Sequence, residues 1–184
     1  MGKAKRHVLI TGLPGCGKTT LIRNLARRLK EAGVPLFGFW TEEIRERGRR
    51  VGFGIELVGG QKGTLAHEGL RSGPRVSRYR VDVEGFEALS VPEMERAIAA
   101  ASRGHVVLIV DEIGKMEMFS ERFREVLLDA LESPLIVVAT ILRAPNPFTD
   151  QVKARADVRL VSITAGNREQ VGEEIFQAFA RGAG

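Results

Sequence analysis

The chain has 184 residues, of which 43% are apolar and 28% are charged, and no apolar run reaches the roughly 18 residues that cross a bilayer. These values argue against a membrane protein and predict one globular domain over residues 1–184, because the length is too short for two full-sized domains. The sequence has no signal-peptide pattern, and its single cysteine cannot form an internal disulfide, so we expect a cytoplasmic protein.

Strand-like and helix-like apolar patterns alternate along the chain. The first half predicts a strand at 7–11, a helix over 21–29, a strand at 36–41, antiparallel hairpins from 51–57 and 63–66, a surface loop at 68–78 and an extended piece at 79–83. The second half predicts a helix that begins at the capping-box pattern of 90–93, a strand at 105–110, a helix over 119–131, a strand at 135–140, a short helix at 150–156, a strand at 158–163 and a helix at 167–181.

Five of these strands alternate with helical segments along the chain. This alternation predicts a mostly parallel five-stranded core sheet with helices on both faces. The expected class is therefore a three-layer α/β fold with a small antiparallel hairpin insertion. In such sheets ligands bind beyond the carboxyl ends of the strands.

A glycine-rich segment lies between the first predicted strand and the first predicted helix, and it consists of Gly12, Leu13, Pro14, Gly15, Cys16, Gly17, Lys18, Thr19 and Thr20. Its spacing, Gly-x-x-x-x-Gly-Lys-Thr, is that of a P-loop (Walker A) for a nucleoside triphosphate and Mg²⁺. Backbone N–H groups and the helix N-terminus would face the phosphates, with Lys18 on the outer phosphates and the Thr19 hydroxyl on Mg²⁺. Cys16 is either a small filler or a reactive thiol beside a helix N-terminus.

Polar residues end two of the apolar strands. Asp111 follows the strand at 105–110, where a P-loop protein places the Walker B acid that holds Mg²⁺, and Glu112 can polarise a water for attack on the γ-phosphate. Thr140 either senses the γ-phosphate or is structural. We also assign Gly114 and Lys115, which come shortly after Glu112, to the nucleotide-binding residues.

The negative charge that develops on the phosphate oxygens in the transition state needs a positively charged side chain besides Lys18 to stabilise it. The candidates are Lys115, Arg143 and an arginine from another chain.

The formal charge of +5 raises the question of nucleic-acid binding. The densest basic cluster, at 45–50, has a central glycine and no interleaved aromatic residue, which favours a solvated hairpin turn over a base-stacking surface. We therefore expect a nucleoside triphosphate, and not a nucleic acid, to be the primary ligand. We also expect no membrane association, and a monomer.

Four segments resemble one known family. They are 38–45, 48–53, Val110-Asp111-Glu112-Ile113-Gly114-Lys115-Met116-Glu117-Met118-Phe119-Ser120 and 164–168. They are similar to the small nucleoside-triphosphatase family that includes human cancer-related nucleoside triphosphatase. The resemblance covers nearly the whole chain.

The resemblance implies a P-loop fold of the additional-strand type, with the fourth core strand between the first and the third. It also implies hydrolysis of ATP, GTP, CTP and UTP to the diphosphate and phosphate with broad base tolerance. By position, the catalytic glutamate is Glu112, and the magnesium ligands are Asp111 and Thr19.

Two other functions share these motifs. A nucleotide or nucleoside kinase would transfer the γ-phosphate to an acceptor, although Glu112 beside the magnesium acid would promote wasteful hydrolysis. A nucleotide-dependent switch or adaptor would bind a protein or RNA, although the Asn-Lys-x-Asp signature of ordinary GTPases is absent from the sequence.

Overall fold

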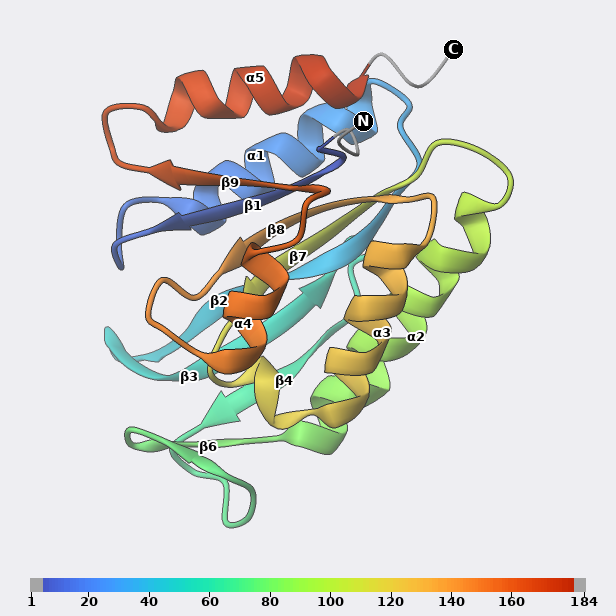
Figure 1. Ribbon diagram of the computed structural model, residues 1–184. Helices are drawn as coiled ribbons and strands as arrows, with labels where there is room; N and C mark the ends of the chain where they lie inside the picture. The colour runs from blue at the N-terminus through green and yellow to red at the C-terminus, as the bar shows by residue number, and fades with distance from the viewer. Residues whose placement is uncertain (1–4, 181–184) are drawn as a thin grey trace.

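A computed structural model describes residues 5–180, which form a single nine-stranded sheet in the order β5-β6-β4-β3-β2-β7-β8-β1-β9 (Figure 1). The strands are β1 (His7–Gly12), β2 (Leu36–Glu46), β3 (Arg49–Leu57), β4 (Lys62–His67), β5 (Arg75–Val76), β6 (Tyr79–Val81), β7 (Val107–Ile113), β8 (Ile136–Ile141) and β9 (Val158–Ile163). The helices are α1 (Lys18–Glu31), α2 (Val83–Ala101), α3 (Glu121–Glu132), α4 (Pro147–Lys153) and α5 (Arg168–Ala180), with a 3₁₀ turn η1 (Glu117–Phe119). None of these helices is long and apolar enough to cross a membrane.

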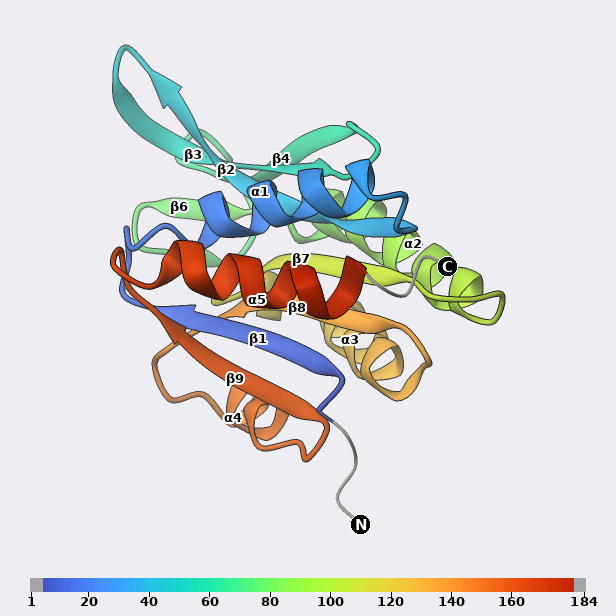
Figure 2. The same ribbon diagram turned by 90° about the horizontal axis from the view of Figure 1, so that it is seen from above.

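The core of the sheet is five parallel strands in the order β2-β7-β8-β1-β9. Because β8 pairs with both β1 and β7, the fourth core strand lies between the first and the third, which confirms the additional-strand topology. Helices α1 and α5 cover one face, and α2 and α3 cover the other (Figures 1 and 2). The predicted three-layer α/β class is therefore correct.

The antiparallel insertion is larger than predicted and continues the same sheet. Leu36–Phe39 of β2 pair with β7, and Phe39–Glu46 pair with β3, so one long strand belongs to both parts. Strands β3, β4, β6 and β5 then extend the sheet outward. The segment predicted as a loop at 68–78 contains the short strand β5.

Helix α2 begins at Val83, so the predicted start at Ser90 is wrong. Asp82 caps the helix by accepting a hydrogen bond from the Gly85 N–H at 3.0 Å. Ser90 Oγ instead donates to the Phe86 carbonyl at 2.8 Å, and Glu93 accepts from the Gly38 N–H at 3.0 Å. The capping-box pattern is thus used for a mid-helix bond and for a tertiary contact with β2, which the local sequence cannot reveal.

Two other helix starts differ from the predicted positions. Phe119 lies in the 3₁₀ turn η1 with 43% of its surface exposed, and α3 begins after Ser120, whose Oγ accepts from the Phe123 N–H at 2.8 Å. Helix α4 begins three residues before the predicted position because Asn146 caps it and Pro147 suits the first helical position. The predicted end of the last helix, Arg181, lies outside the described residues.

Aromatic packing fills the space between the sheet and α2 and α3. Phe39, Phe86 and Phe123 are each fully buried, and their rings meet edge to face with centroids 5.3 to 6.2 Å apart. Such pairs add about 0.5–1.5 kcal/mol to area burial. This cluster fixes α2 and α3 beneath the sheet that positions the site.

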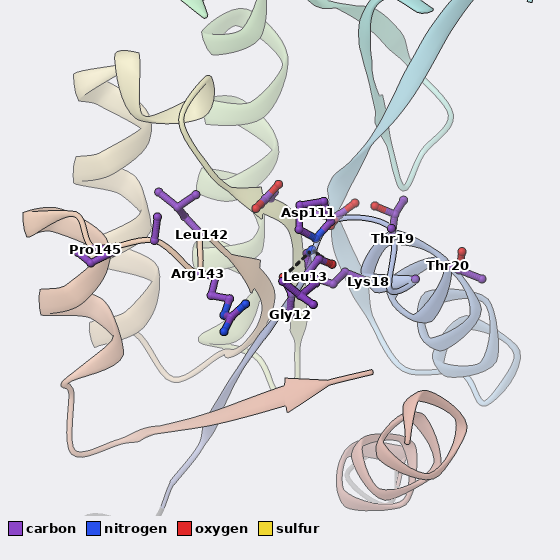
Figure 3. A pocket seen from close by; sticks show the side chains of 14 residues that line it. Gly12, Leu13, Lys18, Thr19, Thr20, Asp111, Leu142, Arg143 and Pro145 are labelled. Carbon is purple, nitrogen blue, oxygen red and sulfur yellow. Dashed lines mark hydrogen bonds between the residues drawn. The ribbon is translucent and has the colours of Figure 1, made fainter. Parts of the chain in front are cut away.

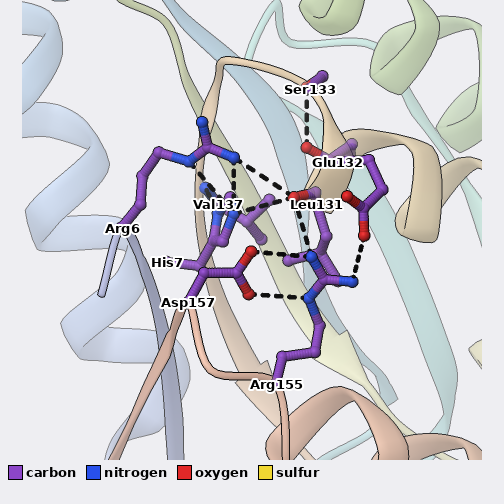
Figure 4. Close-up of polar contacts among 9 residues, drawn as sticks. Arg6, His7, Leu131, Glu132, Ser133, Val137, Arg155 and Asp157 are labelled. Atoms are coloured by element: carbon purple, nitrogen blue, oxygen red, sulfur yellow. Dashed lines mark hydrogen bonds and ion pairs between the residues drawn. The ribbon is translucent and has the colours of Figure 1, made fainter. Parts of the chain in front are cut away.

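A polar cluster ties β1 to β8 and β9 at the amino ends of the strands, away from the P-loop (Figure 4). His7 is fully buried, its Nδ1 accepts from the Val137 N–H at 3.0 Å, and its Nε2 donates to the Leu131 carbonyl at 3.1 Å. The two hydrogen bonds need one ring nitrogen as acceptor and the other as donor, and only the neutral imidazole provides both. Burial, with the nearby Arg6 charge, lowers the pKa of His7 from 6.5 to about 4.

Candidate active site

The glycine-rich loop connects the buried strand β1 to α1, as its sequence predicts. Gly15 and Gly17 have positive φ values of 78° and 94°, which other residues rarely adopt. A Cβ on Gly17 would also lie 2.3 Å from Arg168 Nη1, because α5 packs against the loop at this point. Lys18 Nζ donates to the carbonyl oxygens of Gly12 and Leu13 at 3.2 and 3.3 Å, which holds its charge over the loop.

Strand β7 carries the carboxylate pair to the same edge of the sheet. Asp111 and Glu112 are part of β7 itself, which runs to Ile113 instead of ending at Val110. Asp111 is 2% exposed, and its Oδ1 accepts a hydrogen bond from Thr140 Oγ1 of β8 at 2.5 Å. The structure therefore gives Thr140 a positioning contact with Asp111.

Burial dominates the electrostatics of both carboxylates. It raises the pKa of Asp111, against the lowering effects of the Thr140 and Thr19 hydroxyls and of Lys18. The pKa of Glu112 is raised by burial first and by the Asp111 charge second, and Lys18 opposes both. A cation beside the pair would stabilise both charged forms.

One cavity of about 830 Å³ joins these elements (Figure 3). It is lined by Gly12, Leu13, Pro14, Gly15, Gly17, Lys18, Thr19, Thr20, Asp111, Glu112, Leu142, Arg143, Ala144 and Pro145. Its volume lies in the range of small-molecule and nucleotide sites. A helix N-terminus, an ammonium group and two carboxylates thus face one space at the carboxyl edge of the sheet.

Three of the predicted site residues do not line this cavity. Cys16 is half-buried, and its Sγ lies 2.7 Å from the position of a Cβ on Gly12, which fits a small filler. Gly114 is buried and Lys115 is exposed, and neither contacts the cavity.

Gly114 instead makes room for two carboxyl groups. A Cβ on Gly114 would lie 2.9 Å from Glu117 Oε2 and 3.2 Å from Glu112 Cδ. Glu117 is 4% exposed, and burial, followed by the Glu112 charge, raises its pKa to about 8. No local sequence pattern singles out Glu117, because the turn at Gly114 is what brings it close to Glu112.

In the loop after β8, Arg143 is the one cavity-lining residue that the sequence predicted as a candidate. Leu142, Ala144 and Pro145 form one wall of the cavity, and the Arg143 side chain points into it (Figure 3). Arg143 makes no ion pair or hydrogen bond with another residue in 5–180, in contrast to most arginines of the chain. Among these residues there is also no group of three or more His, Cys, Asp or Glu side chains that could hold a metal.

Comparison with known proteins gives a consistent result. A family model described as NTPase matches residues 7–176. The nucleoside-triphosphatase THEP1 of Thermotoga sp. strain RQ2 is 43% identical, over 95% of this chain and 97% of that protein. The crystal structure of THEP1 from the hyperthermophile Aquifex aeolicus superposes with a TM-score of 0.84 at 35% identity, covering 94% of this chain and 98% of the other.

The solution structure of a human cancer-related nucleoside triphosphatase superposes with a TM-score of 0.82 at 38% identity. It covers 94% of this chain and 96% of that one. These findings confirm the resemblance that the sequence segments indicated.

Proposed function

The chain belongs to this family of nucleoside-triphosphatases and hydrolyses nucleoside triphosphates, and on that premise we propose the following roles for its residues. The nine residues Gly12 to Thr20 bind the phosphates, and Lys18 contacts the outer ones. Glu112 is the general base. The observation that supports this scheme is that Glu112 and the P-loop line one cavity.

The proposed reaction is in-line attack of water on the γ-phosphorus. Glu112 accepts a proton from the attacking water, the new P–O bond forms, and the bond to the β-phosphate oxygen breaks. The products are the nucleoside diphosphate and inorganic phosphate. Lys18 stays beside the β- and γ-phosphates, where it offsets the charge that moves onto the leaving oxygen.

Mg²⁺ is the proposed cofactor, and the residues fit it. Asp111 Oδ2 is buried without a hydrogen-bond partner in the described part of the chain, and Thr19 lines the cavity beside it. Carboxylate and hydroxyl oxygens are the ligands that this hard cation prefers, with phosphates completing its shell. Bound there, Mg²⁺ would neutralise phosphate charge.

Arg143 is the proposed second cation of the transition state. Its side chain faces the P-loop across the cavity, whereas Lys115 lies outside it. Since the P-loop, the carboxylates and Arg143 all come from one chain, the scheme requires no second subunit.

We therefore propose that the enzyme is a monomer. We also propose that it is a cytoplasmic protein of one domain with the nucleotide as its primary ligand.

Broad base tolerance is proposed from the cavity wall. The side chains of Leu13, Leu142, Ala144 and Pro145 carry no hydrogen-bonding groups that could distinguish one base from another. The P-loop contacts are all with phosphates. We expect rates with ATP, GTP, CTP and UTP that differ by less than about tenfold, because strong discrimination needs buried polar contacts.

Phosphate release tests the proposal with the four triphosphates, with and without Mg²⁺ and nucleoside monophosphates. We expect Glu112→Gln to lower kcat about 10²- to 10⁴-fold with little change in nucleotide affinity, and Lys18→Ala to weaken both. Wild-type turnover by the Glu112 variant would refute the general-base role. Stoichiometric phosphate transfer to a monophosphate would support the kinase instead.

A further inference from the structure

The excess positive charge of this protein is concentrated in one region. Residues 43–50 and 68–80, which we call the basic surface, contain eight arginines, three glutamates, and no lysine or aspartate. The chain has 28 basic and 23 acidic residues in all, so 20 of each remain outside this surface. The entire formal charge of +5 therefore belongs to two short segments.

The two segments are neighbours only in the folded sheet. The first is the β2–β3 hairpin, which projects from the body of the protein (Figure 2), and the second runs through β5 and β6. Arg49 pairs with Glu68, and Arg78 Nη2 donates to the Arg50 carbonyl. These contacts join the segments into one surface.

The internal ion pairs leave most of this charge uncompensated. Glu43 pairs with Arg45 and Arg50, and Glu68 pairs with Arg49 and Arg78. Arg47, at the hairpin tip, and Arg71 are exposed and have no ion pair among residues 5–180. Arg75 is also exposed, and within residues 5–180 its guanidinium group donates to the Ser77 carbonyl and makes no ion pair. Three guanidinium groups are thus available to an external anion.

Aromatic rings hold two further arginines in fixed orientations. The Arg50 guanidinium lies 5.1 Å from the Phe53 ring centroid, and that of Arg78 lies 5.1 Å from the Tyr79 centroid. Tyr79 Oη also accepts from Nε of both arginines at 3.1 Å. Flat guanidinium groups that are held in this way can pair with phosphates and stack on unpaired bases.

We propose that the basic surface binds single-stranded RNA. Its net charge is complementary to a phosphate backbone, and all of its basic residues are arginines, which serve both phosphate pairing and base stacking. No helix lies on this surface to enter the groove of a duplex (Figure 1). Persistently unpaired bases occur mainly in RNA loops and ends.

The distribution of apolar residues argues against a membrane or a protein as the partner. In residues 5–180 the large apolar side chains that are exposed are Leu13, Phe119 and Leu160, and none of them is in the basic surface. Membrane-surface sites add inserted apolar residues to basic ones, and protein interfaces have an apolar centre.

The basic surface is at the same edge of the sheet as the active site. Phe39 of β2 pairs with Val110, which directly precedes Asp111, and β2 continues from there toward the hairpin tip. At about 3.3 Å per residue, Arg47 is about 26 Å along the strand from Phe39. RNA on this surface would lie beside the nucleotide site without occupying it.

The test measures anisotropy of a fluorescein-labelled, unstructured RNA of about 20 nucleotides at about 50 to 200 mM NaCl. The variant combines Arg47→Gln, Arg71→Gln and Arg75→Gln. We expect its Kd to rise at least about tenfold at low salt, and the slope of log K against log salt to fall by about 2, since each lost phosphate contact contributes about 0.7.

A matched control variant combines Arg27→Gln, Arg103→Gln and Arg159→Gln, which removes the same charge from exposed positions elsewhere. We expect it to bind RNA nearly as the wild type does, and both variants to keep RNA-free triphosphate hydrolysis, which reports an intact fold. Equal losses in the two variants would overturn the proposal. So would an absence of RNA binding at low salt, or tighter binding of duplex DNA or phosphatidylserine vesicles.

Discussion

His7→Asn should remove a specific part of the acid sensitivity of this fold. His7 is neutral in the folded protein, with a pKa of about 4, whereas the unfolded chain binds a proton at about 6.5. The unfolded state therefore takes up more protons as the pH falls, and the stability contributed by the neutral ring is lost from about pH 6.5 toward 4. Between pH 7 and pH 5 this loss amounts to about 2 kcal/mol.

The measurement is urea and thermal unfolding, followed by circular dichroism, at pH 7, 6 and 5. In a chain of this size, 2 kcal/mol corresponds to a fall of about 4–8 °C in Tm. The Asn variant is less stable at pH 7, because the ring contacts with Leu131 and Val137 are altered, but it should lack this increment of pH dependence. If variant and wild type lose the same free energy of unfolding between pH 7 and pH 5, then His7 is not a buried neutral ring and the reasoning is refuted.

Three further predictions concern the site and the core. Arg143→Gln should lower kcat at least about tenfold in phosphate-release assays, whereas Lys115→Gln should leave kcat unchanged because Lys115 lies outside the cavity. A larger loss of kcat in the Lys115 variant would assign the transition-state role to Lys115 instead. Gly17→Ala should weaken Mg-ATP binding about tenfold in calorimetry, because a φ of 94° strains a residue that has a Cβ by about 1–2 kcal/mol, and unchanged affinity would contradict this loop geometry. Phe86→Ala should cost about 3–5 kcal/mol in urea unfolding because it empties a fully buried aromatic position, and a cost below about 1 kcal/mol would show that the cluster is not close-packed.

Local spacing in the sequence was sufficient for the P-loop. The role proposed for each fixed position between Gly12 and Thr19 follows from the spacing within the loop, and the flanking strand and helix are visible in the apolar periodicity. Strands β7 and β8 were also predicted from a local pattern, because strands covered on both faces are continuously apolar. Their parallel order follows from the alternation with helices and from the family resemblance.

The sequence could not decide contacts between distant segments. The pattern at Ser90 and Glu93 satisfied a local rule for a helix start, but Asp82 provides the cap and Glu93 binds the backbone of β2. In the same way, Gly114 and Lys115 follow the carboxylate pair directly, yet the chain turns away from the cavity there and Gly114 accommodates Glu117 instead.

What the sequence determined by itself was the glycine-rich loop between β1 and α1 and the position of the acids near the end of β7, because short-range spacing encodes both. The tertiary structure decided which cation faces the P-loop, since Arg143 reaches the cavity only through the path of the loop after β8. It also decided where the charge excess gathers, since residues 43–50 and 68–80 become one surface only when β4 pairs with both β3 and β6. Pairing between strands brings residues together across sequence separations that periodicity and spacing do not record.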